Sequence, residues 1–505
     1  MKPLFCVAFA AALAALSSEA RAETFVVTRF DDPLPDGCAV SDCSLREAAV
    51  AATANDPFGP TDIIQLAAGT YTLIRGELPI AKQGTEVVGA SSAQTIITSD
   101  TTLFSSYSGA QARPLTLRGM QIRGLGFGND ELLLEDIFVP SDGSGISIGG
   151  EETRVEIRDS ELRKPIFCNQ SSGYCAIRNT LFFGMYVNPG GNDPSTATVL
   201  IKDSIVDGTL DPNPTLPSTI VLHDGASIDI EDSTITHSEV HVVRAGPPTN
   251  LRRVLYLDNL AQISADVPAE MLIEDSELRD NEHRAVRADN GSHWKVRGSS
   301  FVNNRVNGTA GGAIVVEGGA TMDIRNSTFS GNSFTVDAAS GGARGAAIGY
   351  RSGGASLLLR HVTIAAPTFL PTGIVGTAIG GFDGANASLD ISNSIVRGTC
   401  FLDGALENNA GNVESPGNTC GFDTNASKVS VTSSDLALGV LGDHGGFTPT
   451  YEPAPDSVAV DGGGSQQCLP LDQRGYLRPA GDACDAGSVE VGAIDDTLFS
   501  DDFDG

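Results

Sequence analysis

Ile157-Arg158-Asp159-Ser160-Glu161-Leu162 is one copy of a six-residue pattern that recurs through most of the chain. Each copy has an apolar residue, any residue, one of Asp, Asn, Gly or His, usually Ser or Thr, any residue and a second apolar residue. The mean spacing is about 25 residues, and only short alternating stretches flank each copy, so the unit is strand-based and not a helical repeat. Other copies begin at Ile177, Ile201, Ile230, Ile273, Val296, Ile324, Leu359 and Ile391, with weaker ones at Leu117 and Leu134 and a degenerate one near 251–260.

The pattern has a direct structural interpretation. Its two apolar residues point inward from successive strands, and the Asp or Asn between them occupies a tight corner. Asp and Asn tolerate a left-handed backbone there, and the following Ser or Thr can cap the corner. One corner per repeat bends the chain into a coil, and coils stack about 4.8 Å apart. The sequence therefore predicts an all-β parallel β-helix, a solenoid on the order of 60 Å long.

Composition limits the class of protein. Hydrophobic residues make up 41% of the 505 residues, which excludes disorder, and 58 Gly with a single Trp suit many short strands joined by turns. The net charge of −31 favours a soluble monomer and repels nucleic acid and anionic membranes. No Asp/Asn loop has the ligand spacing of a Ca²⁺ site, so we expect neither a bound metal nor a cofactor.

The first 22 residues have the layout of a signal peptide. Lys2 supplies a positive charge, an apolar run extends from Leu4 to Leu16, and Ala20-Arg21-Ala22 fits a cleavage site between small residues. The run is too short to span a bilayer, and no later apolar run is long enough to do so. We therefore expect an exported protein, secreted or at a bacterial cell surface, without a transmembrane segment.

Both ends of the solenoid have their own sequences. Ser44-Leu45-Arg46-Glu47 has the form of a capping box before an alanine-rich run, which predicts a helix over 44–54 that plugs the first coil. After Val396 the repeat fades into sequence rich in Asn and Gly. The expected parts are a signal peptide (1–22), an N-terminal cap with the first coils (23–75), the β-helix (76–400), a turn-rich closing module (401–492) and an acidic tail (493–505).

Nine cysteines are present, and Cys6 lies in the expected leader. The other eight fall into four close pairs, and an even number in an oxidising compartment indicates disulfides. Sequential pairing is favoured because each pair is local and the intervals between pairs are long. A structural metal site has little support, since no CxxC spacing occurs. The expected disulfides are Cys38–Cys43, Cys168–Cys175, Cys400–Cys420 and Cys468–Cys484.

Two terminal stretches resemble bacterial surface proteins. Cys43-Ser-Leu-Arg-Glu-Ala48, with Gly69-Thr-Tyr71 downstream, looks like the CSLREA-type N-terminal segment of surface β-helix proteins. Residues 435–492 resemble the closing module of the choice-of-anchor proteins, although His444 stands where that module commonly has Asn. The matching residues are Gly445-Gly-Phe-Thr448, Pro455-Asp-Ser-Val-Ala-Val-Asp461, Cys468, Asp472-Gln-Arg-Gly475, Arg478-Pro479 and Cys484-Asp485.

A third resemblance lies in the middle of the chain. Phe301-Val-Asn-Asn304 and Gly311-Gly-Ala-Ile314 are similar to the FxxN and GGAI motifs of polymorphic outer-membrane proteins, and Phe329-Ser-Gly-Asn332 repeats the first motif. Together the three resemblances imply a right-handed parallel β-helix on or outside a bacterial cell. They supply no catalytic residues.

An enzymatic function is the main alternative, because a β-helix can carry a polysaccharide lyase or hydrolase site. A hydrolase needs two or three close carboxylates, and Glu231, Asp232, Glu274 and Asp275 could approach each other on nearby coils. Both Asp are corner residues of the repeat, so we assign them to the turns and assign no catalytic residue. The densest polar stretch runs from Asp275 to Arg297 and contains Asp280, Glu282, His283, Arg284, Arg287, Asp289 and His293.

Three shorter motifs carry little functional weight. His237 and His241 are spaced to share a strand face, but no third metal ligand accompanies them. Gly145-Ile-Ser-Ile-Gly149 has the form GxSxG without the helix that a nucleophile elbow requires. Gly124-Leu-Gly-Phe-Gly128 lacks the strand–helix context of a phosphate loop.

The residue before each corner gives the sharpest functional hypothesis. Strand side chains alternate, so this residue points outward in every coil and should form one ladder along the rod. Seven of its eleven members are basic, and like charges at coil spacing repel unless an anion lies between them. The expected ladder is Arg118, Glu135, Arg158, Arg178, Lys202, Glu231, Glu274, Arg297, Arg325, Arg360 and Ser392.

The ladder contains two basic runs, Arg158–Arg178–Lys202 and Arg297–Arg325–Arg360. Arg suits bidentate contacts with carboxylate or sulfate, so an extended acidic polysaccharide is the expected ligand. The alternative is a ladder of solvated charges that nearby acids neutralise. We therefore expect a secreted or cell-surface β-helix for binding or adhesion without catalysis, and keep a polysaccharide lyase or glycoside hydrolase as the alternative.

Overall fold

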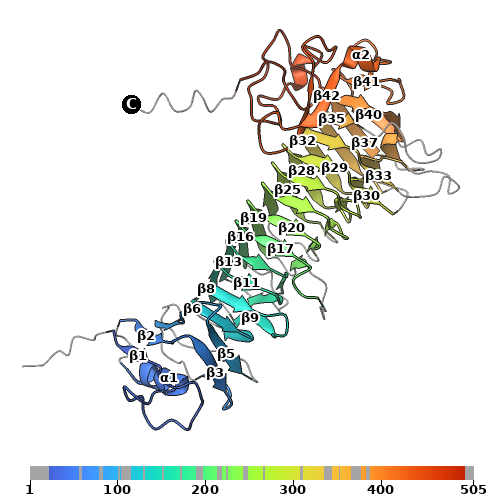
Figure 1. Ribbon diagram of the computed structural model, residues 1–505. Helices are drawn as coiled ribbons and strands as arrows, with labels where there is room; N and C mark the ends of the chain where they lie inside the picture. The colour runs from blue at the N-terminus through green and yellow to red at the C-terminus, as the bar shows by residue number, and fades with distance from the viewer. Residues whose placement is uncertain are drawn as a thin grey trace, which may run out of the picture.

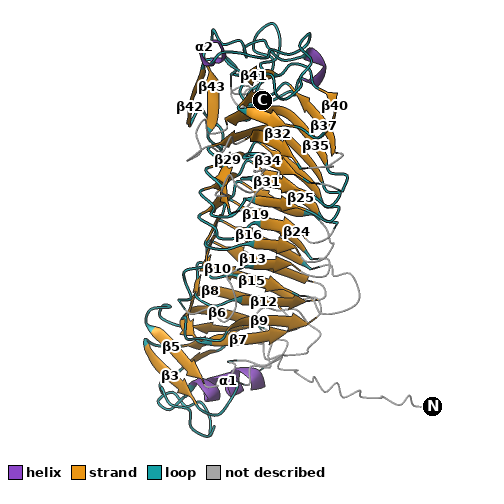
Figure 2. Cartoon of the chain, turned by 90° about the vertical axis from the view of Figure 1, so that its right-hand side faces the viewer, coloured by secondary structure: helices purple, strands orange, loops and turns teal. Residues whose placement is uncertain are grey.

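The chain forms one elongated rod in a computed structural model, with α1 (Leu45–Ala54) at the N-terminal end and α2 (Ser433–Leu436) at the other (Figures 1 and 2). All of the expected signal peptide except Ala22, and the tail beyond Ile494, lie outside the described residues. The structure describes residues 22–55, 60–78, 84–99, 103, 115–128, 131–150, 153–170, 173–188, 197–212, 219–222, 226–242, 248–265, 268–307, 311–334, 344–351, 353–365, 377–382 and 387–494.

Parallel strands stack coil upon coil to make three long faces. We call them the first, second and third face, in the order in which the chain meets them in each coil. The first face contains β1 (Thr24–Val26), β2 (Asp62–Gln65), β4 (Thr85–Val88), β6 (Leu115–Ile122), β8 (Glu131–Val139), β10 (Thr153–Arg158), β13 (Gly173–Arg178), β16 (Thr198–Lys202), β19 (Ser227–Glu231), β22 (Thr249–Arg252), β25 (Glu270–Glu274), β28 (His293–Arg297), β32 (Thr321–Ser330), β35 (Ser356–Ala365), β37 (Ala387–Ser392) and β40 (Gly404–Asn408).

The second face joins the first in one 27-stranded sheet of the described residues, because β6, β8, β32 and β35 run across the corner between them. Register is continuous through the central coils, as where Val155 pairs with Cys175, and shifts by one residue in the pair of β37 with β40. Besides those four strands, the second face contains β3 (Gly69–Leu73), β5 (Thr95–Ser99), β11 (Glu161–Leu162), β14 (Leu181–Phe182), β17 (Ile205–Asp207), β20 (Thr234–Thr236), β23 (Leu255–Leu257), β26 (Glu277–Arg279), β29 (Ser300–Val302), β38 (Ile395–Arg397) and β41 (Val413–Ser415).

The third face is a separate 12-stranded parallel sheet of the described residues. Two short pairs complete the strands: β30 (Arg305–Val306) with β33 (Ser333–Phe334), and the antiparallel β42 (Leu438–Gly442) with β43 (Thr450–Pro453). The third face contains β7 (Gly124–Gly128), β9 (Gly145–Gly150), β12 (Ile166–Gln170), β15 (Met185–Val187), β18 (Ile220–Leu222), β21 (Val240–Val242), β24 (Ile263–Ala265), β27 (Val286–Ala288), β31 (Ile314–Val316), β34 (Ile348–Tyr350), β36 (Thr377–Gly381) and β39 (Thr399–Phe401).

The corner between the first and second faces has the left-handed backbone that the repeat predicts. Asp159 has φ +53° and Asn179 has φ +44°. Arg253 occupies the corner of the degenerate copy with φ +52°, a conformation that residues other than Gly, Asn and Asp seldom adopt. We call the stacked positions the corner ladder: Gly119, Asp136, Asp159, Asn179, Asp203, Asp232, Arg253, Asp275, Gly298, Asn326, His361 and Asn393.

Hydroxyls directly after the corners tie one coil to the next. Ser204 Oγ donates to the Lys202 carbonyl at 2.6 Å and accepts from the Thr180 amide at 3.2 Å in the preceding coil. Ser299 repeats this arrangement with the Arg297 carbonyl and the Ser276 amide. Because these hydroxyls are buried and bonded on both sides, they satisfy amides that the turn would otherwise leave unpaired.

A second corner follows the second face in the later coils, and the sequence pattern did not reveal it. Asp258, Asp280 and Asn303 adopt positive φ there, and each precedes a buried Asn. These amides form a ladder in which Asn281 Nδ2 donates to Asn304 Oδ1 at 2.7 Å. The second Asn of the Phe301-Val-Asn-Asn304 motif is therefore a structural residue of the coil.

The interior is a continuous apolar column. Ile157, Ile177 and Ile201 are fully buried, and Phe301 stacks on Phe329 with centroids 4.7 Å apart. At the N-terminal end, Ser44 and Glu47 form the expected capping box of α1, which buries Leu45 and several alanines against the first coil. The pattern of inward and outward positions expected from the repeat is confirmed, and so is a parallel β-helix.

The closing module lies against the side of the last coils as well as beyond them. Outward hydroxyls of the second face meet it: Thr328 donates to Gln473 at 2.7 Å, and Thr363 bonds Ser488 at 3.1 Å. Both Thr side chains are buried by this contact. Within the module, Arg478 and Glu490 form a completely buried ion pair of 2.7 Å. The module therefore covers an otherwise solvent-facing strand surface (Figure 1).

Three of the four expected disulfides are formed: Cys38–Cys43, Cys400–Cys420 and Cys468–Cys484. Cys168 of β12 and Cys175 of β13 are free and buried, with their sulfurs 2.6 Å apart. The two side chains thus lie next to each other as the pairing requires, but the bond itself stays a prediction. No described helix is long and apolar enough to cross a bilayer.

Candidate binding surface

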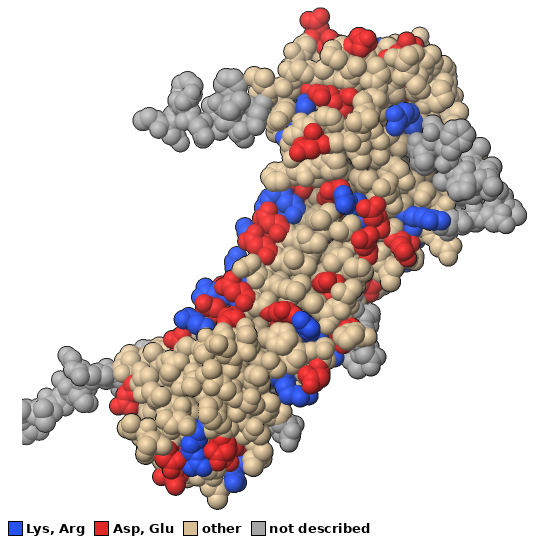
Figure 3. All heavy atoms as spheres, in the orientation of Figure 1, with Lys and Arg blue, Asp and Glu red and all other residues tan. Residues whose placement is uncertain are grey.

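The predicted ladder of outward residues has the expected register, except that its last member, Ser392, is aligned with Arg360 but buried. Arg158 pairs with Arg178, Arg178 with Lys202, and Lys202 with Glu231 across successive strands of the first face. At the other end Arg297, Arg325 and Arg360 are aligned in the same way. The degenerate copy adds Arg252 between Glu231 and Glu274. Figure 3 shows the resulting alternation of basic and acidic side chains along one edge of the rod.

Acidic neighbours neutralise the second basic run. The Asp323 carboxylate lies between two ladder residues, 2.6 Å from Arg297 and 2.9 Å from Arg325. Arg360 lies 3.5 Å from Asp390. Asp323 stands two positions before Arg325 on the same strand, so its side chain shares the outward face. Stacked like charges need an anion between them. In the run Arg297–Arg325–Arg360, the protein itself supplies that anion as Asp323.

Pairing is looser in the first basic run. Arg158 contacts Glu135 at 2.6 Å, and this hydrogen bond raises the pKa of the guanidinium. Lys202 lies 3.4 Å from Glu231, and Arg178 lies 3.9 Å from Glu156. Each of the three basic side chains is at least one third exposed. This run therefore keeps donors that a ligand can share.

A groove of about 660 Å³ runs along the corner ladder next to the first run. Asp159, Asn179 and Asp203, each directly after a basic ladder residue, line it. Asn179 Nδ2 donates to Asp159 Oδ1 at 2.6 Å, which aligns the two polar groups between coils. Other lining residues are Ser92, Ala93, Gln121, Ile137, Phe138, Ser160, Glu161, Thr180, Leu181 and Ile205.

The groove combines polar side chains with an apolar wall from the second face. Phe138 and Leu181 lie two coils apart on that face, with Glu161 between them, and Ile205 is 45% exposed. Arg163 bonds Glu161 at 2.6 Å and lies 5.2 Å from the Phe138 ring, which holds the outer wall in place. The basic ladder and the line formed by Asp159, Asn179 and Asp203 were predictable from the sequence, whereas Phe138 and the groove itself were not.

The polar stretch from Asp275 to Arg297 does not converge on one site. Asp275 is in the corner ladder and Asp280 in the second corner, whereas Arg287 lies on the third face between Asp289 (2.6 Å) and Glu317 (2.7 Å). Burial, with a smaller contribution from Glu274, raises the pKa of Asp275 to about 6. Two coils before Asp275, a hydrogen bond from Arg253 lowers the pKa of Asp232.

The shorter motifs have structural positions. His237 is a left-handed corner residue with φ +51° and His241 lies on β21, so the expectation that they share a strand face is wrong. Ser147 of the GxSxG motif lies on β9, and the motif at Gly124–Gly128 is β7. Neither motif has the strand–helix geometry of a nucleophile elbow or a phosphate loop.

Comparison with known proteins supports the β-helix fold. Residues 144–364 match the family model described as "Right handed beta helix region". No curated protein sequence matches the chain. A solved α-1,3-glucanase catalytic unit from Streptomyces thermodiastaticus is 12% identical, covers 71% of this chain and 67% of its own, and has a TM-score of 0.39. A solved pectate lyase is 11% identical, covers 93% and 96%, and has a TM-score of 0.21.

These structural likenesses are too distant to carry an argument about activity. The family model spans the central coils, where the strand register and the corner ladder are continuous. The fold of this chain is a right-handed parallel β-helix.

Proposed function

We propose that the protein is a secreted or cell-surface β-helix that binds extracellular polysaccharide in the corner groove without cleaving it. The observation that carries this proposal is the repetition of polar groups at coil spacing: Asp159, Asn179 and Asp203 line the groove, and Arg158, Arg178 and Lys202 directly precede them in the chain. A surface that repeats the same groups suits a polymer that repeats the same sugar.

The charges of the groove favour an uncharged sugar chain. Asp159, Glu161 and Asp203 offer carboxylates to the ligand, and the basic ladder residues that precede the corners are already shared with acidic neighbours. An acidic polysaccharide would face these carboxylates, whereas sugar hydroxyls can donate to them and accept from Arg and Lys. Three disulfides and the resemblance of Cys43–Ala48 and 435–492 to bacterial surface proteins support a location outside the cell.

A glycan array with the chain from residue 23 onward tests the proposal. The groove variant replaces Asp159, Asn179 and Asp203 with Gly, which keeps the left-handed corners because Gly adopts positive φ without strain. Its matched control makes the same change at Asp258, Asp280 and Asn303 of the second corner. We expect the groove variant to lose about tenfold or more in affinity and the control to bind as wild type. If both variants bind equally well, the corner groove is not the binding site.

Glycan cleavage is the second candidate function, and Asp275 is the observation that favours it. A carboxyl with a raised pKa near a carboxylate with a lowered pKa is the division of roles found in acid–base pairs. Against it, Arg253 stands between Asp232 and Asp275 in the corner ladder. We expect no product from polygalacturonate, alginate or uncharged glucans, with or without Ca²⁺. Product formation that Asp275→Asn or Arg284→Ala abolishes would establish an enzyme instead.

A further inference from the structure

His361 occupies an unusual place in the corner ladder. Its backbone has φ +52°, a conformation that Asp, Asn or Gly adopts at most other corners of the ladder. The closing module covers this corner, and the imidazole is completely buried. Nε2 accepts from Asn393 Nδ2 at 3.2 Å and from the Leu469 amide at 3.4 Å. Nδ1 has no hydrogen-bond partner among the described residues.

A buried nitrogen without a partner costs free energy that an Asn at this corner would avoid, since Asn393 fills the next corner of the ladder. The corner geometry therefore does not explain why a histidine stands here. The sulfurs of Cys468 and Cys484 lie near the imidazole ring. One ring nitrogen and the two sulfurs all lie within 4.8 Å of one another.

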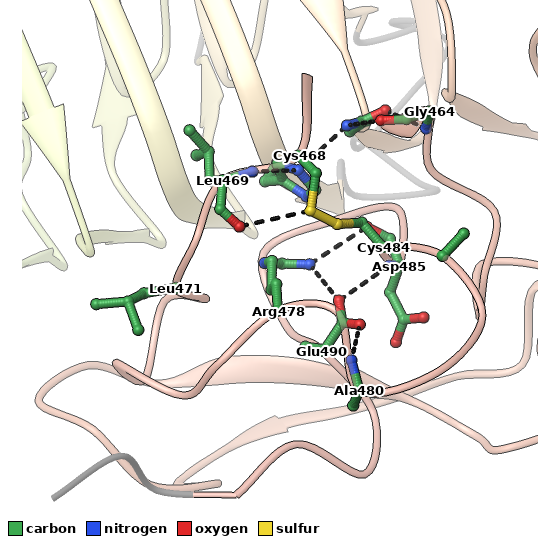
Figure 4. Close-up of a disulfide and its surroundings, with 12 residues drawn as sticks. Gly464, Cys468, Leu469, Leu471, Arg478, Ala480, Cys484, Asp485 and Glu490 are labelled. Atoms are coloured by element: carbon green, nitrogen blue, oxygen red, sulfur yellow. Dashed lines mark hydrogen bonds and ion pairs between the residues drawn. A yellow bond between two sulfur atoms is a disulfide. The ribbon is translucent and has the colours of Figure 1, made fainter. Parts of the chain in front are cut away.

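The two cysteines come from the closing module and form a disulfide, which Figure 4 shows beside Arg478 and Glu490. Cys484 is buried and Cys468 is partly exposed, so one side of the cluster remains open to solvent. Arg478 carries a buried positive charge next to this cluster and is compensated by Glu490 at 2.7 Å. A buried cation favours thiolate over thiol, which is the form that binds metals.

We propose that His361, Cys468 and Cys484 form a binding site for a thiolate-preferring divalent ion such as Zn²⁺ when the disulfide is reduced. A dithiol or phosphine reductant supplies two electrons, the S–S bond breaks, and each sulfur becomes a thiolate after its proton leaves. The ion keeps its charge. The neutral imidazole has one lone pair, which now accepts from Asn393 and Leu469 at Nε2, so binding the ion replaces these two hydrogen bonds. Three protein ligands leave the fourth tetrahedral position for water or an external ligand.

Small movements convert the oxidised cluster into this site. Tetrahedral coordination with bonds of about 2.3 Å to sulfur and about 2.0 Å to nitrogen places the sulfurs about 3.8 Å apart and the nitrogen about 3.5 Å from each. The sulfurs must separate after the bond breaks, and the nitrogen must move inward from the present limit of 4.8 Å. Both cysteines lie on module loops rather than on coil strands, so their backbones are not held by strand pairing.

Co²⁺ is a spectroscopic probe for the site, because thiolate ligation gives ligand-to-metal absorption bands that oxygen ligands do not. The reduced wild-type chain is titrated with Co²⁺ and then with Zn²⁺, alongside His361→Asn, which keeps a residue suited to the corner. Cys400→Ser with Cys420→Ser is the control, since it removes a disulfide of similar loop length that joins β39 of the third face to the closing module. Circular dichroism follows the coils throughout.

We expect one Co²⁺ per chain with thiolate bands, displacement by Zn²⁺, and no binding by the oxidised protein. His361→Asn should bind at least tenfold more weakly, and the Cys400/Cys420 control should bind as wild type. Equal binding by wild type and His361→Asn would overturn the proposal, and so would a reduced wild-type protein that takes up no Co²⁺, whether its coils stay folded or not. This result is independent of polysaccharide binding.

Discussion

Ile324 lies between Val296 of the preceding coil and Leu359 of the next, and all three side chains are buried in the interior column. Ile324→Asp would place a carboxylate there with no partner, at a cost of several kcal/mol. We expect the melting temperature to fall sharply. Ser327→Ala should be milder, about 1–3 kcal/mol, because it leaves the Ser299 amide without its acceptor.

Arg325→Ser is the control for this pair, since Arg325 points outward from the same strand. It should change the melting temperature little, because an exposed ion pair contributes about 0–1 kcal/mol. If Ile324→Asp melts like Arg325→Ser, the assignment of inward and outward positions is wrong.

Asp275 gives a pH-dependent prediction at the same scale. Its pKa in the folded protein is raised to about 6, above the ordinary value of 3.8, so the folded state holds the proton more tightly than the unfolded chain. Stability from this group is present at low pH and lost as the pH rises from 3.8 through 6. Asp275→Asn removes that loss and still suits the corner. The melting temperature of Asp275→Asn minus that of wild type should increase from pH 4 to pH 8. If this difference stays constant or decreases, burial does not raise the pKa of Asp275.

Single residues were predictable where the constraint is local. The corner positions of Asp159, Asn179 and Asp203 followed from the backbone preference of their residue types, and the outward ladder followed from strand alternation. The partners of the ladder were not predictable in the same way. Asp323 reaches both Arg297 and Arg325, and that contact depends on rotamers and on the neighbouring strand.

Strands β12 and β13 carry the next prediction, because they hold Cys168 and Cys175 with sulfurs 2.6 Å apart. A non-reducing peptide map of the secreted protein should show this pair crosslinked together with the three disulfides described above. Burial raises the pKa of the Cys168 thiol, so any unbonded fraction should react slowly with alkylating agents in the native state. Crosslinks between distant cysteines in the peptide map would reject the pairing of Cys168 with Cys175. Rapid alkylation of both thiols in the native protein would reject it as well.

The closing module depends on its buried ion pair. Glu490→Gln leaves Arg478 charged and completely buried without a carboxylate, which should cost about 3–5 kcal/mol. Asp323→Asn removes the two ion pairs that Asp323 makes in the ladder and should cost about 1 kcal/mol or less for each. Limited proteolysis should therefore release the module from Glu490→Gln at lower temperature than from Asp323→Asn. Equal protection of the two variants would mean that the module is held mainly by its contacts with Thr328 and Thr363.

At the level of elements, the helix over 44–54 was predictable because its capping box is contiguous in sequence, and α1 spans Leu45–Ala54. The side-on docking of the closing module was not. It pairs Gln473 and Ser488 with Thr328 and Thr363, more than a hundred residues earlier, and nothing in a repeat marks which outward hydroxyls will be covered. His361 became part of a cluster with Cys468 and Cys484 through the same docking.

The whole molecule is an acidic rod whose net charge is −31, yet one of its edges carries aligned and mostly paired basic side chains. Internal pairing explains how like charges stack at coil spacing without a ligand. The two basic runs also differ in their surroundings. Arg158–Arg178–Lys202 lies next to the corner groove, whereas Arg297–Arg325–Arg360 contacts Asp323 and Asp390. A polysaccharide held at the groove would lie across the coils and leave the closing module uncovered.

One titration tests polysaccharide binding at the corner groove most directly. The best array ligand is titrated at low and high salt into wild type, into the triple variant Arg158→Ser, Arg178→Ser, Lys202→Ser, and into the matched triple variant Arg297→Ser, Arg325→Ser, Arg360→Ser. We predict that the first variant loses about tenfold or more in affinity, that the second binds as wild type, and that salt changes the wild-type affinity little. Equal losses in both variants, no loss in the first, or affinity that collapses with salt would contradict an uncharged chain bound beside Arg158, Arg178 and Lys202.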